Sequence, residues 1–138
     1  MAKTSGLGAQ VTVADSGGTP RDFSNDITDF TLATPVALQD TTGIDKSAHE
    51  RLALLRDLTS QLKGVCNFAA NMSHAVLSTA TTSAINRACV VAPTSNHSTP
   101  QLPFNALIGS YDMTRGADGA LTFQSDLSLA DGALPTWA

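Results

Sequence analysis

Polar and apolar side chains alternate along the longest regular segments of this 138-residue sequence. Successive side chains of a β-strand point to opposite faces of the sheet, so this alternation indicates strands with one dry and one wet face. Within residues 56–66, the apolar positions are Leu58, Leu62 and Cys66, and the polar positions are Asp57, Thr59, Gln61 and Lys63. Within residues 121–127, Leu121, Phe123 and Leu127 oppose Thr122, Gln124 and Asp126. The sequence therefore predicts half-solvated strands.

Further segments show the same bias toward β structure. Valine and threonine alternate at 11–13, and a turn cluster at 15–20 separates them from 21–24, which predicts a hairpin. We also predict strands at 26–32, 36–40, 84–92 and 104–114, the last joined to 121–127 by a turn at 115–119. Glutamate occurs once and lysine three times, so strong charged helix formers are scarce. Composition and pattern both favour a mainly β fold.

Two segments carry helical signals. Residues 47–50 match the S-x-x-E capping box, and Ala48, Leu52 and Leu55 follow at helical spacing. Residues 41–55 are therefore interpreted as either a short helix or a long ordered loop. Asn71 is a suitable N-cap for a helix over 72–80, whose apolar side would contain Met72, Ala75, Val76 and Ala80.

The length of the chain suits a single domain over residues 1–138. Residues 1–8 lack apolar periodicity and are expected to form a flexible N-terminal arm, and residues 131–138 a C-terminal tail. The first ten residues lack the apolar region of a signal peptide, and no apolar run has the length of a membrane span. We therefore expect a chain that is made and used without crossing a membrane.

No residue pattern indicates catalysis, a metal or a cofactor. His49, His74 and His97 are more than twenty residues apart and match no metal-ligand spacing. Cys66 and Cys89 are interpreted as small buried hydrophobic residues. The net charge of −4 argues against a surface built to neutralise nucleic-acid phosphates. These features make an enzyme the weakest hypothesis.

Several segments together resemble the major tail proteins of long-tailed actinobacterial phages. They are residues 17–28 (GGTPRDFSNDIT), 39–48 (QDTTGIDKSA), 50–52 (ERL), 57–65 (DLTSQLKGV), 71–77 (NMSHAVL) and 111–119 (YDMTRGADG). The resemblance covers nearly the whole chain. It implies an antiparallel β-sandwich or barrel-like tail tube fold with one flanking α-helix and long loops.

The same resemblance implies a structural subunit of a virion tail. Six copies would form a ring, and stacked rings would form a tube that conducts viral DNA without binding it specifically. The implied partners are further copies of the chain, a tail terminator, a tape measure protein and a distal tail protein, without a membrane. Synthesis would take place in the cytoplasm of the host bacterium.

Two sets of candidate residues follow for such a tube. The alternating strands predict lumen-facing side chains, which are Asp57, Thr59, Gln61, Lys63, Asp112, Thr114, Thr122, Gln124 and Asp126. Long connections in a compact domain are usually functional or disordered, so the arm and the middle segment are candidates for contacts between subunits and rings. These residues are Lys3, Thr4, Ser5, Leu7, Thr41, Ile44, Lys46, His49 and Arg51.

Two other functions remain open on the sequence. A tail terminator or a head-to-tail adaptor would also form a ring, but it would stop at one ring where a tube subunit polymerises. A small ligand-binding β-sandwich would stay monomeric.

Overall fold

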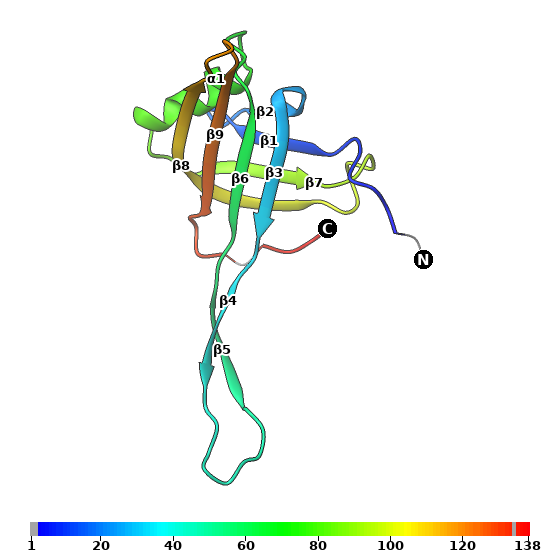
Figure 1. Cartoon of the computed structure of the whole chain (residues 1–138), viewed down its shortest axis with the longest axis vertical. Coiled ribbons are helices and arrows are strands. Elements are labelled where there is room, and N and C mark those ends of the chain that lie inside the picture. Colours follow the sequence, from blue (N-terminus) through cyan, green and yellow to red (C-terminus); the bar gives the residue numbers. More distant parts are fainter. Residues whose placement is uncertain (1–2, 134) are drawn as a thin grey trace.

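The structure, a computed structural model that describes residues 3–133 and 135–138, is mainly antiparallel β (Figure 1). Its strands are β1 (Gln10–Ala14), β2 (Pro20–Asp22), β3 (Ile27–Ala33), β4 (Val36–Asp40), β5 (Arg51–Arg56), β6 (Thr59–Val65), β7 (Arg87–Ala92), β8 (Leu102–Arg115) and β9 (Leu121–Leu129). The helical segments are α1 (Ser73–Leu77) and two 3-10 turns, η1 (Ser24–Asp26) and η2 (Ser78–Thr81). This architecture confirms the predicted fold class.

One sheet of seven strands, in the order β2-β1-β7-β8-β9-β6-β3, builds both layers of the body. Strand β8 joins the layers, because its first part pairs with β7 and its later part with β9. The β8–β9 register shifts between Ile108 and Ser110, and such a bulge bends the strand that carries it. In Figure 1, β8 passes from the layer of β1 and β7 into the layer of β9, β6 and β3.

The apolar core lies between these layers and follows the predicted alternation. Leu58 and Leu62 are fully buried, whereas Thr59 and Lys63 are exposed. In β9, Phe123 and Leu127 are buried, and they lie opposite the polar positions of the same strand. Cys89 is buried as expected, and Cys66 packs against the core while staying partly exposed. The dry side of the sheet is thus confirmed at Leu58, Leu62, Phe123 and Leu127, whereas Leu121 is only partly buried.

At a corner of the barrel-like body, the Ser24 side chain of η1 joins β1. Its hydroxyl oxygen accepts a hydrogen bond from the Val11 amide at 2.8 Å and donates to the Val11 carbonyl at 3.2 Å. Val11 precedes the part of β1 that pairs with β2. The Ser24 hydroxyl therefore replaces the backbone donor and acceptor that a neighbouring strand would otherwise offer to Val11.

Strands β4 and β5 form a hairpin that projects away from the body (Figure 1). We call residues 36–56 the projecting hairpin. Its strands continue β3 and β6 along the chain, and every residue of β4 and β5 is exposed. The helical alternative for 41–55 is wrong and the loop alternative holds only for 41–50, because 51–55 are extended and belong to β5, which pairs with β4. The apolar residues of this segment face solvent, so no packed helical face forms.

Helix α1 is shorter than predicted and begins differently. The α-helical part covers Ser73–Leu77, and a 3-10 turn follows. Asn71 has a positive φ of 64° and does not cap the helix; Met72 occupies the N-cap position without a side-chain bond. The buried Asp26 carboxylate instead accepts from the Ser73 amide at 3.3 Å and from the Asn67 side chain at 3.0 Å. A distant residue thus supplies the acceptor at the helix start.

The buried side of this helical segment also differs in part from the prediction. Val76 is buried as expected, but Ala75 is exposed, while Ser73 and Leu77 are buried. The helix ends after Leu77, so the predicted stripe that extended to Ala80 has no continuous helix to carry it.

Strand β7 starts at Arg87 rather than at Ala84, and Arg87 is only 1% exposed. Its guanidinium donates to the Ala14 carbonyl at 3.3 Å, to the Thr79 hydroxyl at 2.9 Å and to the Ser83 carbonyl at 3.3 Å. These bonds connect the end of β1 with η2 and the segment before β7. A charge in a strand predicted to be apolar therefore has a structural role.

Gly64 of β6 lies where the backbone of another segment passes closely. A Cβ at this position would overlap the Asp26 carbonyl oxygen and lie 2.9 Å from the Ile27 Cα. We predict that Gly64→Ala lowers the free energy of unfolding by about 3 kcal/mol, because the backbone at Asp26 and Ile27 must shift to make room for the added methyl group. Chemical denaturation would measure this loss. The matched control is Gly109→Ala, whose added carbon would lie 3.6 Å from the Asp126 carbonyl oxygen, an ordinary contact. Equal stability of the two variants would contradict the prediction.

Candidate functional surfaces

The predicted lumen-facing residues come together on one face of a four-stranded layer. Directly paired residues of antiparallel strands share a face. Gln61 pairs with Asp126, and Gln124 pairs with both Lys63 and Asp112. The set, which we call the polar face, contains Thr59, Gln61, Lys63, Asp112, Thr114, Thr122, Gln124 and Asp126. It comes from three strands, β6, β8 and β9.

Strand β3 extends the polar face in a way that the sequence analysis missed. Thr31 pairs with Gln61, and Asp29 pairs with Lys63, so both belong to the same face. The signal was present in the alternation of 29–33, but only the pairing with β6 shows which neighbours these residues have.

Asp57 lies outside this face. Strand β6 starts at Thr59, and Asp57 occupies the joint between the projecting hairpin and the body. Its amide donates to the Pro35 carbonyl at 3.0 Å, and its carboxylate accepts from the Leu58 amide at 2.8 Å. The predicted polar set therefore starts two residues before β6 begins.

Carboxylates dominate the charge of the polar face. Asp29, Asp112 and Asp126 face a single lysine, Lys63, among the residues that the strand pairing places there. The Gln61 amide donates to the Asp126 carboxylate at 3.2 Å. The remaining side chains of the polar face as defined above are neutral and polar, and the exposed Val65, which pairs with Thr122, adds an apolar side chain beside them. Such a surface is hydrated and repels polyanions.

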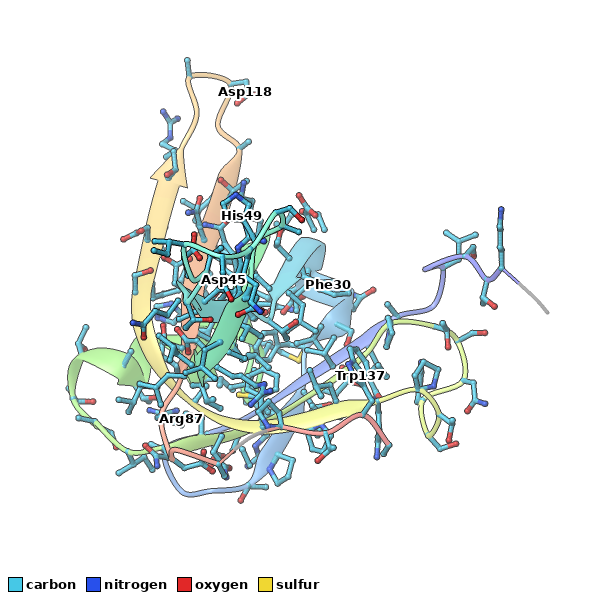
Figure 2. The ribbon with its side chains drawn as sticks, turned by 90° about the horizontal axis from the view of Figure 1, so that it is seen from below. Phe30, Asp45, His49, Arg87, Asp118 and Trp137 are labelled. Atoms are coloured by element: carbon cyan, nitrogen blue, oxygen red, sulfur yellow. The ribbon has the colours of Figure 1, made fainter. Side chains whose placement is uncertain are left out.

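The tip of the projecting hairpin carries the five predicted contact residues of the middle segment. Thr41, Ile44, Lys46, His49 and Arg51 are all exposed. Figure 2 looks at the molecule from this end and shows Asp45 and His49 in front of the body. The structure thus gathers these residues at one extremity.

Hydrogen bonds and ion pairs order the tip. The Thr41 amide donates to the Glu50 carbonyl at 2.9 Å, and the Glu50 amide donates to the Thr42 hydroxyl oxygen at 2.8 Å. The Asp40 carboxylate lies 3.3 Å from the His49 ring, and Lys46 lies 3.7 Å from Glu50. Exposed pairs of this kind contribute little individually, so the backbone and threonine bonds dominate the local order.

The projecting hairpin exposes an unusual amount of apolar surface. Leu55 is 88% exposed and Ile44 is fully exposed. The other exposed apolar side chains of the hairpin are Val36, Leu38, Leu52 and Leu54. Contiguous apolar surface on a soluble protein marks an interaction site, and an isolated two-stranded hairpin is only marginally stable in water. The hairpin therefore has the properties of a surface that another molecule covers.

The N-terminal arm is exposed over its described part. Lys3, Thr4, Ser5 and Leu7 are all exposed, and positions 1 and 2 of the predicted arm lie outside the described residues. The His97 ring, 2.7 Å from the Gly8 carbonyl oxygen, holds the root of the arm against the loop between β7 and β8. This segment and the hairpin stay separate along the chain and are not joined by any described hydrogen bond.

The histidines and cysteines have structural surroundings. In residues 3–133 and 135–138, no group of three His, Cys, Asp or Glu side chains could hold a metal ion. Both cysteines are free, and burial raises the pKa of the Cys89 thiol to about 12, which disfavours the reactive thiolate. His74 packs between Phe68 and Tyr111. Across the described residues, no helix has the length and apolar character to cross a membrane.

Comparison with known proteins identifies this fold. The sequence matches no protein-family model and no curated protein. Among solved structures, the chain is similar to the tail of an empty gene transfer agent particle with C6 symmetry, at a TM-score of 0.72 and 12% identity, with 99% of each chain covered.

Two further structures agree. A chain of the native gene transfer agent virion gives a TM-score of 0.73 at 11% identity over 99% of both chains. The SPP1 tail tube gives 0.72 at 11% identity, over 99% of this chain and 80% of that one. The chain therefore has the phage tail tube fold.

The hairpin tip offers a test of its local structure. Hydrogen bonds from the Thr42 hydroxyl and amide, and then the His49 ring, hold the pKa of Asp40 below its ordinary value of 3.8. The folded tip is thus stabilised above pH 3.8, and this contribution is lost as the pH falls through the lowered pKa. We predict that Thr42→Val raises the Asp40 pKa toward 3.8 in an NMR titration. Thr41→Val, whose side chain makes none of these bonds, should leave it unchanged; a wild-type midpoint at 3.8 would refute the prediction.

Proposed function

We propose that this chain is the repeating subunit of a phage-type tail tube, a structural protein of the virion tail without catalytic activity. The observation that carries the proposal is the tail tube fold, which extends over 99% of the chain. Copies close into rings, which are hexameric in this proposal, by analogy with the C6 symmetry of the gene transfer agent tail. The rings stack into a tube that conducts DNA.

The free edges of the four-stranded layer support ring formation. Among the strands of residues 3–133 and 135–138, β3 is paired with β6 on one side only, and β8 beyond Ile108 is paired with β9 only. The layer β8-β9-β6-β3 therefore ends in an unpaired strand on each side. Exposed strand edges are templates for pairing with another chain, and two different edges make a head-to-tail contact that closes into a ring when the rotation fits.

The polar face supports a lumen-lining role. One face of the layer packs on the core, so the other must meet solvent or a partner. Its neutral and acidic side chains are suited to a water-filled channel, because a basic lining would displace the counterions of DNA and retain it. The polar face, without Asp57 but with the added Asp29 and Thr31, is assigned to this lining.

The projecting hairpin and the arm are assigned to contacts between subunits and rings. Both extend beyond the body, and the hairpin exposes apolar side chains that assembly would bury. At the ends of the tube, the proposed partners are a tail terminator, a tape measure protein and a distal tail protein. The subunit would be made in the cytoplasm of a bacterial host.

Electron microscopy of the purified protein tests this function directly. A tube subunit forms long tubes in negative stain, and the light scattering per unit mass of protein increases with concentration as tubes assemble. A terminator or adaptor would stop at single rings, and a ligand-binding sandwich would remain monomeric. Either of these last two results, at high concentration and neutral pH, would overturn the proposal.

The lumen assignment predicts the effect of added charge. Gln61→Lys combined with Gln124→Lys should leave tube formation intact and slow DNA ejection from virions that carry the variant. Tubes of the variant should also retain duplex DNA at low salt, with log K falling by about 0.9 per neutralised phosphate for each unit of log salt. The control is Asn86→Lys with Ala88→Lys, which adds the same charge at exposed positions of the other layer. Equal DNA retention by both variants would remove the lumen assignment.

Deletion of residues 2–8 tests the role of the arm. The described residues of this segment are exposed, so the melting temperature should stay within a few degrees of the wild type. Tube yield should fall, because contacts between subunits are lost. The yield is measured by sedimentation at several protein concentrations, and an unchanged tube length and yield would exclude the arm from assembly.

A further inference from the structure

The projecting hairpin is joined to the body through a narrow root. The chain enters the hairpin after β3 and leaves it before β6, and between these crossings the Asp57 amide donates to the Pro35 carbonyl at 3.0 Å. The register of β4 and β5 shifts between Val36 and Leu38, directly beyond the root. A bulge disrupts the strand ladder, and a two-stranded ribbon has little stability of its own. A fixed direction of the hairpin therefore requires support from another segment.

The residues that follow β9 lie beside this root. We call residues 130–138, of which the structure describes 130–133 and 135–138, the C-terminal strap. The Leu129 amide donates to the Leu58 carbonyl at 3.0 Å, so the strap starts where the hairpin joins β6. Figure 1 shows the strap passing across the base of the hairpin. The segment predicted as a C-terminal tail thus lies at the joint between hairpin and body.

The strap is attached to the start of β8 near both of its ends. At the first end, the Ala130 amide donates to the Asn105 carbonyl at 3.1 Å, and the Asn105 side chain donates to the Asp131 carboxylate at 2.7 Å. Bonds from the Asn105 side chain and then from a backbone amide hold the pKa of Asp131 below its ordinary value of 3.8. At the second end, the Ala138 amide donates to the Gln101 carbonyl at 2.8 Å, and the Gln101 amide donates to the backbone oxygen of Ala138 at 3.4 Å.

Between these attachments, the strap and the hairpin root line two hollows together. The first, of about 260 Å³, lies between β5 and the strap and is lined by Leu54, Leu55, Gly132 and Ala133. The second, of about 250 Å³, lies between the start of β4 and the strap and is lined by Val36, Asp57, Pro135 and Trp137. Arg56, the last residue of β5, lines both hollows. The strap therefore meets the root beside β5 and again beside β4.

Trp137 is the largest side chain of the strap, and it is half-exposed at the joint (Figure 2). Its hollow is shared with Val36 at the start of β4 and with Leu102 at the start of β8. An indole ring combines a large apolar surface with few rotatable bonds, so it fixes the position of what it covers at a low entropy cost. The ring thus lies where the hairpin and the body meet.

We propose that the C-terminal strap is a brace that fixes the direction of the projecting hairpin, with Trp137 as its positioning side chain. The hairpin continues from β3 and β6, which belong to one layer, whereas the strap is tied to the start of β8 in the other layer. The strap therefore opposes a swing of the hairpin about its root. A segment that is ordered in advance loses less entropy when a partner covers it. This inference concerns the single subunit and stands apart from the tube function.

Distances between two spin labels measure the direction of the hairpin. Ile44→Cys at the tip and Ala88→Cys on β7 carry the labels at exposed positions, and Cys66→Ser leaves only the buried Cys89 besides them. Single subunits are isolated by size-exclusion chromatography and frozen for pulsed EPR. Strand β4 has five residues and is about 17 Å long, so a swing of about 30° at the root displaces its far end by about 9 Å.

The wild-type hairpin should give one narrow distance distribution. Trp137→Ala and Asp131→Ala should each broaden it by about 9 Å, because either change frees the strap from the joint. Trp137→Phe keeps an aromatic ring at the joint and should stay close to the wild type. Melting temperatures show whether each variant is folded.

The chain offers matched controls for both changes. The Asp118 carboxylate accepts from the Ala120 amide at 3.1 Å, as the Asp131 carboxylate does from the Ala133 amide at 3.0 Å, but it lies in the turn between β8 and β9. Asp118→Ala therefore removes a similar local bond away from the strap. Phe68→Ala removes an aromatic side chain of similar exposure outside the joint. Both controls should leave the distance distribution unchanged.

Each outcome decides the proposal. Narrow distributions for both Trp137→Ala and Asp131→Ala would overturn it, because the hairpin would keep its direction without the strap. Broadening by Asp131→Ala alone would remove Trp137 from the positioning role. A broad distribution in the wild type, or equal broadening in the two controls, would also overturn the brace. None of these results bears on the tube function, which microscopy of the assembled protein decides.

Discussion

The pairing of β8 with two different strands is the interaction on which the rest of the structure depends. This strand of 14 residues pairs with β7 through its first part and with β9 through its later part. The bulge between Ile108 and Ser110 bends it, so a single sheet encloses a core between two layers. Because the pairing of β8 with β7 ends at Ala106, the described part of β8 beyond this residue keeps one edge free of a neighbouring strand.

The same pairing explains why this fold suits assembly. A sheet that wraps around one core leaves the outer face of its regular layer in solvent, and here that face is polar and weakly acidic. Its strands β3 and β6 continue beyond the core as a ribbon that, beyond its root, has nothing to pack against in the same chain. Free edges, a polar face and an exposed apolar ribbon are liabilities in a monomer, and the proposed tube would bury or use all three.

Local patterns predicted most strands because a half-buried strand has a period of two. The alternation in 59–65 and 121–127 was confirmed at Leu62, Phe123 and Leu127, which are buried in the core, whereas Val65 is exposed and Leu121 is only partly buried. Prediction failed where local signals had no tertiary support. The capping box at 47–50 lies in the hairpin tip, where the bonds among Asp40, Thr42 and Glu50 set the backbone instead. At the start of α1, the Asp26 carboxylate rather than the Asn71 side chain accepts the hydrogen bond from the Ser73 amide, and no local pattern could indicate this.

By itself, the sequence determined the class of fold, the two faces of the main strands and the absence of a recognisable catalytic pattern. These properties depend on residues that are close in the chain. Only the tertiary structure decided that β3 extends the polar face, that residues 51–56 form a projecting ribbon, and that Phe68 packs against His74. Such features depend on the pairing of strands distant in sequence, and that pairing is selected by the packing of the whole core rather than by any local spacing.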